Sequence, residues 1–102
     1  MDDRAFSLMK PGALLINVAR GAVVERAALE RALAGGRLAG AGLDVFWDEP
    51  WDPDDPLFRR RDVVVMPHVG ASTEEAMATI AAIVGGNVDR VSRGEEPIHR
   101  IA

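Results

Sequence analysis

Cysteine is absent from the 102 residues of the sequence. The chain therefore has no disulfide, no thiolate nucleophile and no cysteine ligand for a metal. Long apolar runs are also absent, since none approaches the roughly 18 residues that a membrane-spanning helix needs. The first ten residues lack the apolar centre of a signal peptide. We therefore expect a cytoplasmic protein that does not bind membranes.

Basic residues are outnumbered, with 12 Lys and Arg against 16 Asp and Glu and a net charge of -4. This acidic balance argues against nucleic acid as a partner. The overall composition is typical of a globular protein, because 48% of the residues are hydrophobic and 27% are charged. The length suits a single domain.

Strand and helix signals alternate along the chain. Three short apolar runs, at residues 13–18, 38–46 and 63–66, predict strands buried on both faces, as in a parallel sheet. Helical spacing of apolar residues predicts one helix at residues 25–34 and another at about 72–93, and residues 2–9 could be a short helical stretch. We expect an α/β fold with a parallel sheet of about three strands and flanking helices. Two helices cannot easily cover both faces of a parallel sheet, so the chain looks like part of a larger fold.

The third helix carries its own start signal. Ser72 and Glu75 have the spacing of a capping box, and an apolar stripe runs from Met77 to Val91. Gly85 and the glycine after it should weaken or bend this helix. Residues 92–102 are expected to form an exposed tail.

Polar residues follow each expected strand, at the edge where ligands bind in open α/β sheets. We single out Arg20, Glu49 and His68, which would converge there if the strands are neighbours. Arginine grips a carboxylate through two hydrogen bonds, and histidine can exchange a proton with a carbonyl or hydroxyl oxygen. A glutamate beside the histidine would hold one tautomer.

Plainer roles for these residues remain open. Arg20 could cap a turn, Glu49 could belong to a solvated acidic loop, and His68 could be an ordinary loop residue. The glycines at positions 40 and 42 imitate a dinucleotide fingerprint, but the third glycine is absent and they lie within an expected strand.

Three stretches, at residues 9–24, 38–50 and 67–76, resemble the signatures of the D-isomer-specific 2-hydroxyacid dehydrogenases. The resemblance implies an NAD(P)-dependent oxidoreductase that interconverts a D-2-hydroxy acid and a 2-keto acid, with no metal. It implies a catalytic set of Arg20, Glu49 and His68. The implied cofactor-binding residues, for NAD or NADP, are Val18, Ala19, Arg20, Asp44, His68, Gly70 and Ala71.

The resemblance also implies a domain assignment. Residues 1–102 would be the C-terminal half of a Rossmann-like NAD-binding domain, ending in the helix at about 72–93 that in the family returns to the substrate domain. The glycine-rich half would come from elsewhere, so we expect a homo-oligomer or a companion chain. The alternative is a non-catalytic, truncated remnant or oligomerising module of the same fold. Glu25 departs from the aspartate common in the family.

The missing glycine-rich turn leads to a first prediction. The isolated chain should bind NADH weakly and turn over little, because such a turn supplies most of the phosphate-binding energy. Titration of the isolated chain with NADH measures this, and a micromolar Kd would contradict it.

Overall fold

A computed structural model describes residues 1–101, which form two units: Met1–Gly70, and the residues from Ala71 onward. The first unit contains α1 (Asp3–Ser7), β1 (Ala13–Asn17), a 3-10 turn (Gly21–Val23), α2 (Arg26–Ala34), β2 (Leu38–Leu43) and β3 (Val63–Val65). The second contains α3 (Glu74–Ser92). None of the helices in the described part of the chain has the length and apolarity needed to cross a membrane.

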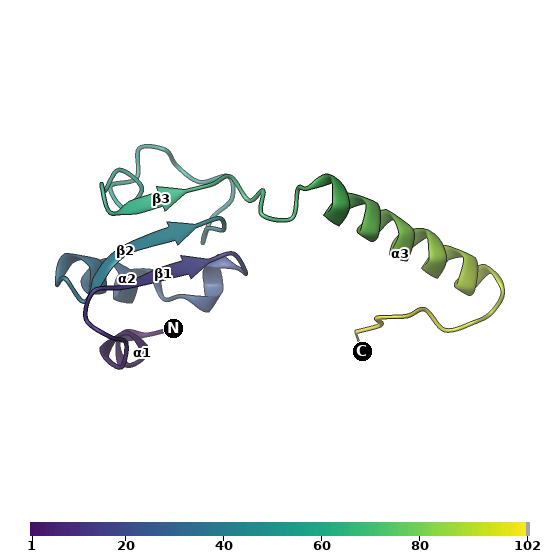
Figure 1. Ribbon diagram of the computed structural model, residues 1–102, viewed down its shortest axis with the longest axis horizontal. Coiled ribbons are helices and arrows are strands. Elements are labelled where there is room, and N and C mark those ends of the chain that lie inside the picture. The colour runs from purple at the N-terminus through teal and green to yellow at the C-terminus, as the bar shows by residue number, and fades with distance from the viewer. Residues whose placement is uncertain (102) are drawn as a thin grey trace. The chain divides into compact units, whose positions relative to one another are not determined.

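The three strands form one parallel sheet in the order β1-β2-β3. Leu15 pairs with Ala41, and Leu43 pairs with Val65. All three strands therefore point the same way, and their carboxyl ends meet at one edge (Figure 1). The predicted α/β fold with a three-stranded parallel sheet is confirmed.

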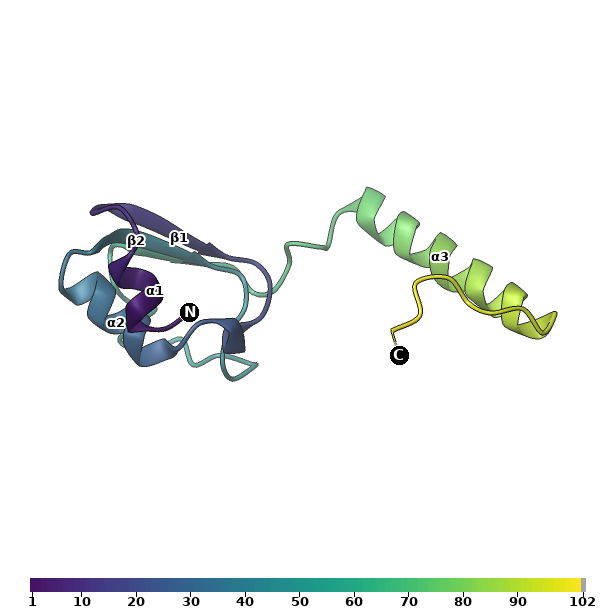
Figure 2. The ribbon, with the colours of Figure 1, turned by 90° about the horizontal axis from the view of Figure 1, so that it is seen from below.

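The core of the first unit lies between the sheet and its two helices. Figure 2 shows α1 and α2 on the same face of the sheet. Ala28 and Leu29 of α2 are fully buried, and Phe6 of α1 and Leu43 of β2 are almost so. Burial of a leucine or phenylalanine side chain contributes roughly 1.5–3 kcal/mol to stability, so these contacts hold α2 against the sheet.

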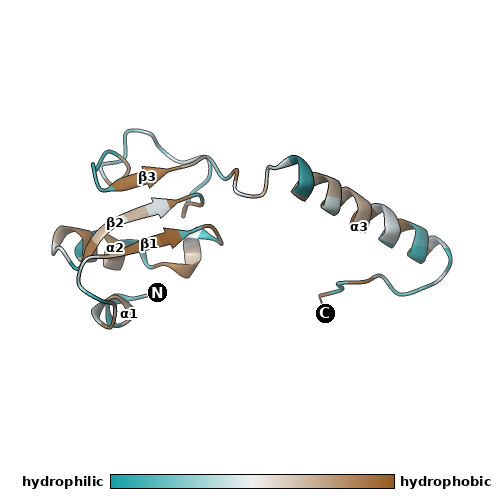
Figure 3. Ribbon diagram, in the orientation of Figure 1, coloured by the Kyte–Doolittle hydropathy of each residue, from teal (hydrophilic) through white to brown (hydrophobic). Residues whose placement is uncertain are grey.

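Within the first unit, neither helix covers the opposite face of the sheet. Leu14, Ile16 and Val64 lie on it with 65%, 66% and 68% of their surfaces exposed, and the apolar colouring of β1 and β3 is plain in Figure 3. The expectation that these strands are buried on both faces is therefore wrong for this part of the chain. The reason is that both helices of the first unit pack on one side only.

Strand β2 is shorter than the apolar run at residues 38–46 predicted. The Asp44 N–H still donates to the Asn17 carbonyl at 3.0 Å, but regular pairing with β3 ends at Leu43. Phe46 then turns its ring into the core, where it stacks on Trp51. Apolar residues beyond the strand are buried in a loop instead.

The second unit begins its helix one residue later than the capping box predicted. Thr73 is the N-cap of α3, and its hydroxyl accepts the Ala76 N–H at 3.1 Å, so the assignment to Ser72 and Glu75 is wrong. The helix is continuous through both glycines at 85–86. No residue of α3 is buried.

The segment after α3 is exposed but not a free tail. Gly94, at φ +74°, ends the helix in a Schellman motif: its N–H donates to the Val91 carbonyl, and the Glu95 N–H donates to the Arg90 carbonyl. The Asn87 side chain then both donates to and accepts from the backbone of Ile98, at 3.1 and 2.8 Å. Ala102, the last residue of the predicted tail, lies outside the described residues.

The uncovered sheet face predicts self-association of the isolated chain, because exposed apolar patches of this kind seek a partner. Sedimentation should show species larger than a monomer, and the substitutions Ile16→Lys and Val64→Lys should lower the mass. Leu8→Lys is the matched control, since Leu8 is exposed at the end of α1. A wild-type monomer with a cooperative melt would contradict the prediction.

Candidate active site

Glu49 and His68 meet at the carboxyl edge of the sheet. Glu49 lies in the loop after β2, and His68 follows β3. His68 Nδ1 is 2.8 Å from Glu49 Oε2. Because an ionised carboxylate only accepts hydrogen bonds, this contact places the proton on Nδ1. Both side chains remain partly open to solvent, with 44% of His68 and 40% of Glu49 exposed.

The second oxygen of Glu49 also has a donor. The Phe46 N–H donates to Glu49 Oε1 at 3.1 Å. The hydrogen bond from His68, then that from Phe46, and finally the positive charge of Arg20 lower the pKa of Glu49. Glu49 is therefore held as a carboxylate at neutral pH.

Arg20 lies in the turn after β1, which a buried asparagine shapes. The Asn17 side chain donates to the Arg20 carbonyl at 3.0 Å and accepts the Ala19 N–H at 3.1 Å. The Arg20 guanidinium donates to the Ala19 carbonyl at 2.6 Å. Sequence reasoning did not assign a role to Asn17, although an asparagine closing an apolar run was a signal for such a turn.

Asp44 is a buried carboxylate, 5% exposed, that spans two strand ends. One oxygen accepts the Val69 N–H at 2.9 Å, and the other accepts the Gly70 N–H at 2.7 Å. A Cβ at position 70 would come within 2.6 Å of the second oxygen, so glycine permits this approach. Asp44 thus fastens the segment that follows His68 to the end of β2.

His68 itself adopts a left-handed backbone conformation, with φ +56°. For a residue with a side chain, this conformation costs about 1–3 kcal/mol and persists only where neighbours enforce it. The two hydrogen bonds to Asp44 come from the next two residues and supply that enforcement. The strained turn directs the imidazole toward Glu49.

The remaining cofactor candidates divide between the two units. Val18 and Asp44 line a groove of about 490 Å³ on the uncovered sheet face, where Val18 is largely exposed. An apolar wall ending in a buried carboxylate suits a flat ring with an amide donor. Ala19 is adjacent to Val18 in the chain, whereas Ala71 is the first residue of the second unit.

Other binding features are missing from the part of the chain that the structure describes. It holds no glycine-rich strand–turn–helix for phosphates. It also holds no group of three or more His, Asp or Glu side chains placed to bind a metal ion.

Comparison with known families gives a direct match. Residues 1–70 match the D-isomer specific 2-hydroxyacid dehydrogenase, NAD binding domain. That range coincides with the first unit, Met1–Gly70. The chain therefore belongs to the D-isomer specific 2-hydroxyacid dehydrogenase family, which confirms the resemblance.

Individual relatives are longer than this chain. It is 46% identical over 95 residues to a glyoxylate reductase of Thermococcus litoralis, covering 93% of this chain and 28% of the relative. It is 40% identical over 89 residues to a D-3-phosphoglycerate dehydrogenase of Archaeoglobus fulgidus, covering 87% of this chain and 17% of the relative. The chain thus spans less than a third of either protein.

Solved structures show the same fold. A D-isomer specific 2-hydroxyacid dehydrogenase from Xanthobacter autotrophicus Py2, in complex with NADPH and MES, superimposes with a TM-score of 0.86 at 36% identity. The match covers 100% of this chain and 41% of the other. A glyoxylate reductase from Paecilomyes thermophila superimposes with a TM-score of 0.83 at 32% identity, over 94% of this chain and 29% of the other.

The Glu49–His68 contact predicts a pH dependence. Because the pKa of Glu49 is lowered, the bond is complete at neutral pH, contributes stability above the unfolded-state pKa, and is lost as pH falls through the folded-state pKa. The carboxyl ¹³C shift of Glu49, followed by NMR, should report a midpoint below that of an unpaired glutamate. His68→Gln should raise the midpoint, and an unchanged midpoint in that variant would contradict the pairing.

Proposed function

We propose that residues 1–102 are the C-terminal half of the NAD-binding domain of a D-2-hydroxyacid dehydrogenase, and that Arg20, Glu49 and His68 are its catalytic set. The reaction would interconvert a 2-hydroxy acid and a 2-keto acid with NAD or NADP. The observation that carries the proposal is the 2.8 Å contact between His68 and Glu49 at the carboxyl edge of the sheet. Family membership supports the reaction class.

His68 would handle the proton of the substrate hydroxyl. With Nδ1–H directed at Glu49, the neutral ring leaves Nε2 as a base that can accept a proton from a hydroxyl group. When the ring is protonated, the same Nε2–H can donate to a keto oxygen. Glu49, held as a carboxylate, stabilises the charged ring and keeps its orientation.

Arg20 would bind the substrate carboxylate. Its planar guanidinium can form two parallel hydrogen bonds to a carboxylate, which fixes the substrate as well as attracting it. Among the described residues, no carboxylate lies within 4.0 Å of the Arg20 side chain. Its positive charge contributes, as the smallest of the causes, to the lowered pKa of Glu49, which supports a role beside the acid–base pair.

The cofactor's nicotinamide, when bound, supplies the hydride transfer itself. Val18 would offer an apolar wall to the ring, and the second lone pairs of the Asp44 oxygens could accept from its carboxamide. Ala19 and Gly70 would border this site. The relatives include a structure in complex with NADPH and another with NADP, which supports a dinucleotide as cofactor.

A second candidate function is a non-catalytic, oligomerising module of the same fold. The uncovered sheet face with Leu14, Ile16 and Val64 favours it, because that face needs a covering partner. A homo-oligomer or a complex with a companion chain is compatible with both candidate functions. A measurement of catalytic activity distinguishes the two.

The decisive experiment measures the oxidation of NADH and NADPH, with glyoxylate as substrate. The sample is the assembled protein, either the homo-oligomer or the complex with a companion chain. His68→Ala should lower kcat by about 10²- to 10⁴-fold, the usual contribution of a general acid–base group, without changing the sedimentation profile. Arg20→Gln should raise KM for glyoxylate more than KM for the cofactor.

Arg59→Gln is the matched control for the loss of one positive charge, because Arg59 pairs with Asp54. It should leave kcat and KM unchanged. Undiminished activity in His68→Ala would refute the acid–base assignment. A wild-type protein that neither binds nor oxidises the cofactor would favour the non-catalytic module.

A further inference from the structure

We propose that Arg26 is a positioning residue that holds Glu49 opposite His68 by fastening both sides of the loop after β2 to α2. The inference rests on the proposed function, because it concerns the same acid–base pair. Arg26 is the first residue of α2 and contacts neither Glu49 nor His68 in the hydrogen bonds and ion pairs of the described residues. It acts through the loop.

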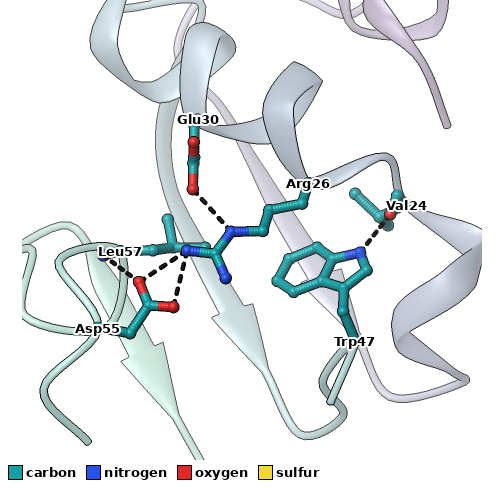
Figure 4. A network of polar contacts seen from close by, with 6 residues as sticks. All are labelled: Val24, Arg26, Glu30, Trp47, Asp55 and Leu57. Carbon is teal, nitrogen blue, oxygen red and sulfur yellow. Dashed lines mark hydrogen bonds and ion pairs between the residues drawn. The ribbon is translucent and has the colours of Figure 1, made fainter. Parts of the chain in front are cut away.

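One side of the attachment is Trp47, two residues before Glu49. The Arg26 guanidinium carbon lies 5.7 Å from the centre of the Trp47 ring, within the range of a cation–π contact. Trp47 Nε1 donates to the Val24 carbonyl at 2.6 Å (Figure 4). The start of the loop is thus tied to the residues that lead into α2.

The other side is Asp55, six residues after Glu49. Arg26 Nη2 lies 2.8 and 2.7 Å from the two Asp55 oxygens, and the Asp55 side chain is only 12% exposed. Asp55 Oδ1 also accepts the Leu57 N–H at 2.9 Å, as Figure 4 shows. A charge pair with one largely buried partner is less screened by water than an exposed pair.

Between these two attachments, aromatic packing fixes the rest of the loop. The rings of Phe46, Trp51 and Phe58 contact one another at centroid distances of 5.1–5.3 Å. Phe46 also donates its N–H to Glu49. The position of the Glu49 carboxylate therefore depends on a loop held at Trp47, at Phe46 and at Asp55.

The arrangement uses the shape of arginine. Nε donates to Glu30 at 2.9 Å while Nη2 reaches Asp55, and the flat group lies by the Trp47 ring. The hydrogen bond to Glu30 raises the pKa of Arg26, so the group keeps its charge. A lysine has one compact ammonium and cannot make all three contacts in this geometry.

The test follows the carboxyl ¹³C shift of Glu49 and the Nδ1–H resonance of His68 through pH titrations of the 102-residue chain. Arg26→Gln and Asp55→Asn should each raise the Glu49 midpoint by on the order of half a pH unit, as expected when a charge-assisted hydrogen bond weakens. Both should broaden or shift the His68 resonance.

The sign in Asp55→Asn separates positioning from simple electrostatics. Loss of a negative charge would by itself lower the pKa of Glu49, whereas a displaced loop raises it. The asparagine side chain of this variant keeps an oxygen for the Leu57 N–H, so the local turn is preserved. A Glu49 midpoint that falls or stays constant in Asp55→Asn overturns the proposal.

Arg31→Gln is the control on the same helix. Arg31 pairs with Asp3 and Glu25 rather than with the loop, so its loss should leave both signals unchanged. An equal shift in Arg31→Gln would also overturn the proposal, since any lost charge on α2 would then suffice. Failure of the proposed function is seen separately, as a wild-type protein that does not oxidise NADH or NADPH with glyoxylate while Asp55→Asn still raises the Glu49 midpoint.

Discussion

The buried Asp44 carboxylate is the constraint on which the arrangement of the strand ends depends. It lies at the end of β2 and accepts backbone N–H groups from Val69 and Gly70, which follow β3. A buried carboxylate without partners is costly, whereas two N–H donors satisfy it and fix the donors in return. Because Glu49 leaves the same strand end, the bond between Glu49 and His68 becomes a local consequence of this attachment.

Much of the sheet and of the candidate site at its carboxyl edge was predictable from the sequence. Short apolar runs around Leu15, Ala41 and Val64 predicted strands, and their alternation with helical spacing predicted parallel order. In a parallel sheet, the residues that follow each strand lie at the same edge, the one formed by the carboxyl ends of the strands. The roles assigned to Arg20, Glu49 and His68 rested further on the family resemblance, because each residue type alone is common in loops.

Features set by distant partners were not predictable in the same way. Apolar runs do not reveal whether one or both faces are covered, since that depends on where the helices lie; hence Ile16 is exposed. The N-cap of α3 is Thr73 rather than Ser72 because the two adjacent residues can cap a helix almost equally well. The contact from Arg26 to Asp55 joins positions 29 residues apart, which no local pattern encodes.

The middle strand, β2, makes the uncovered face of the sheet concave. Gly40 and Gly42 have no side chains and stand beside Leu14 and Ile16, whose methyl groups would meet a Cβ at 3.3 and 2.9 Å. The face therefore has a groove along β2 between the aliphatic side chains of β1 and β3. A partner that covers this face must insert large side chains into the groove above the glycines. Shape complementarity, and not apolarity alone, thus selects what can close the sheet.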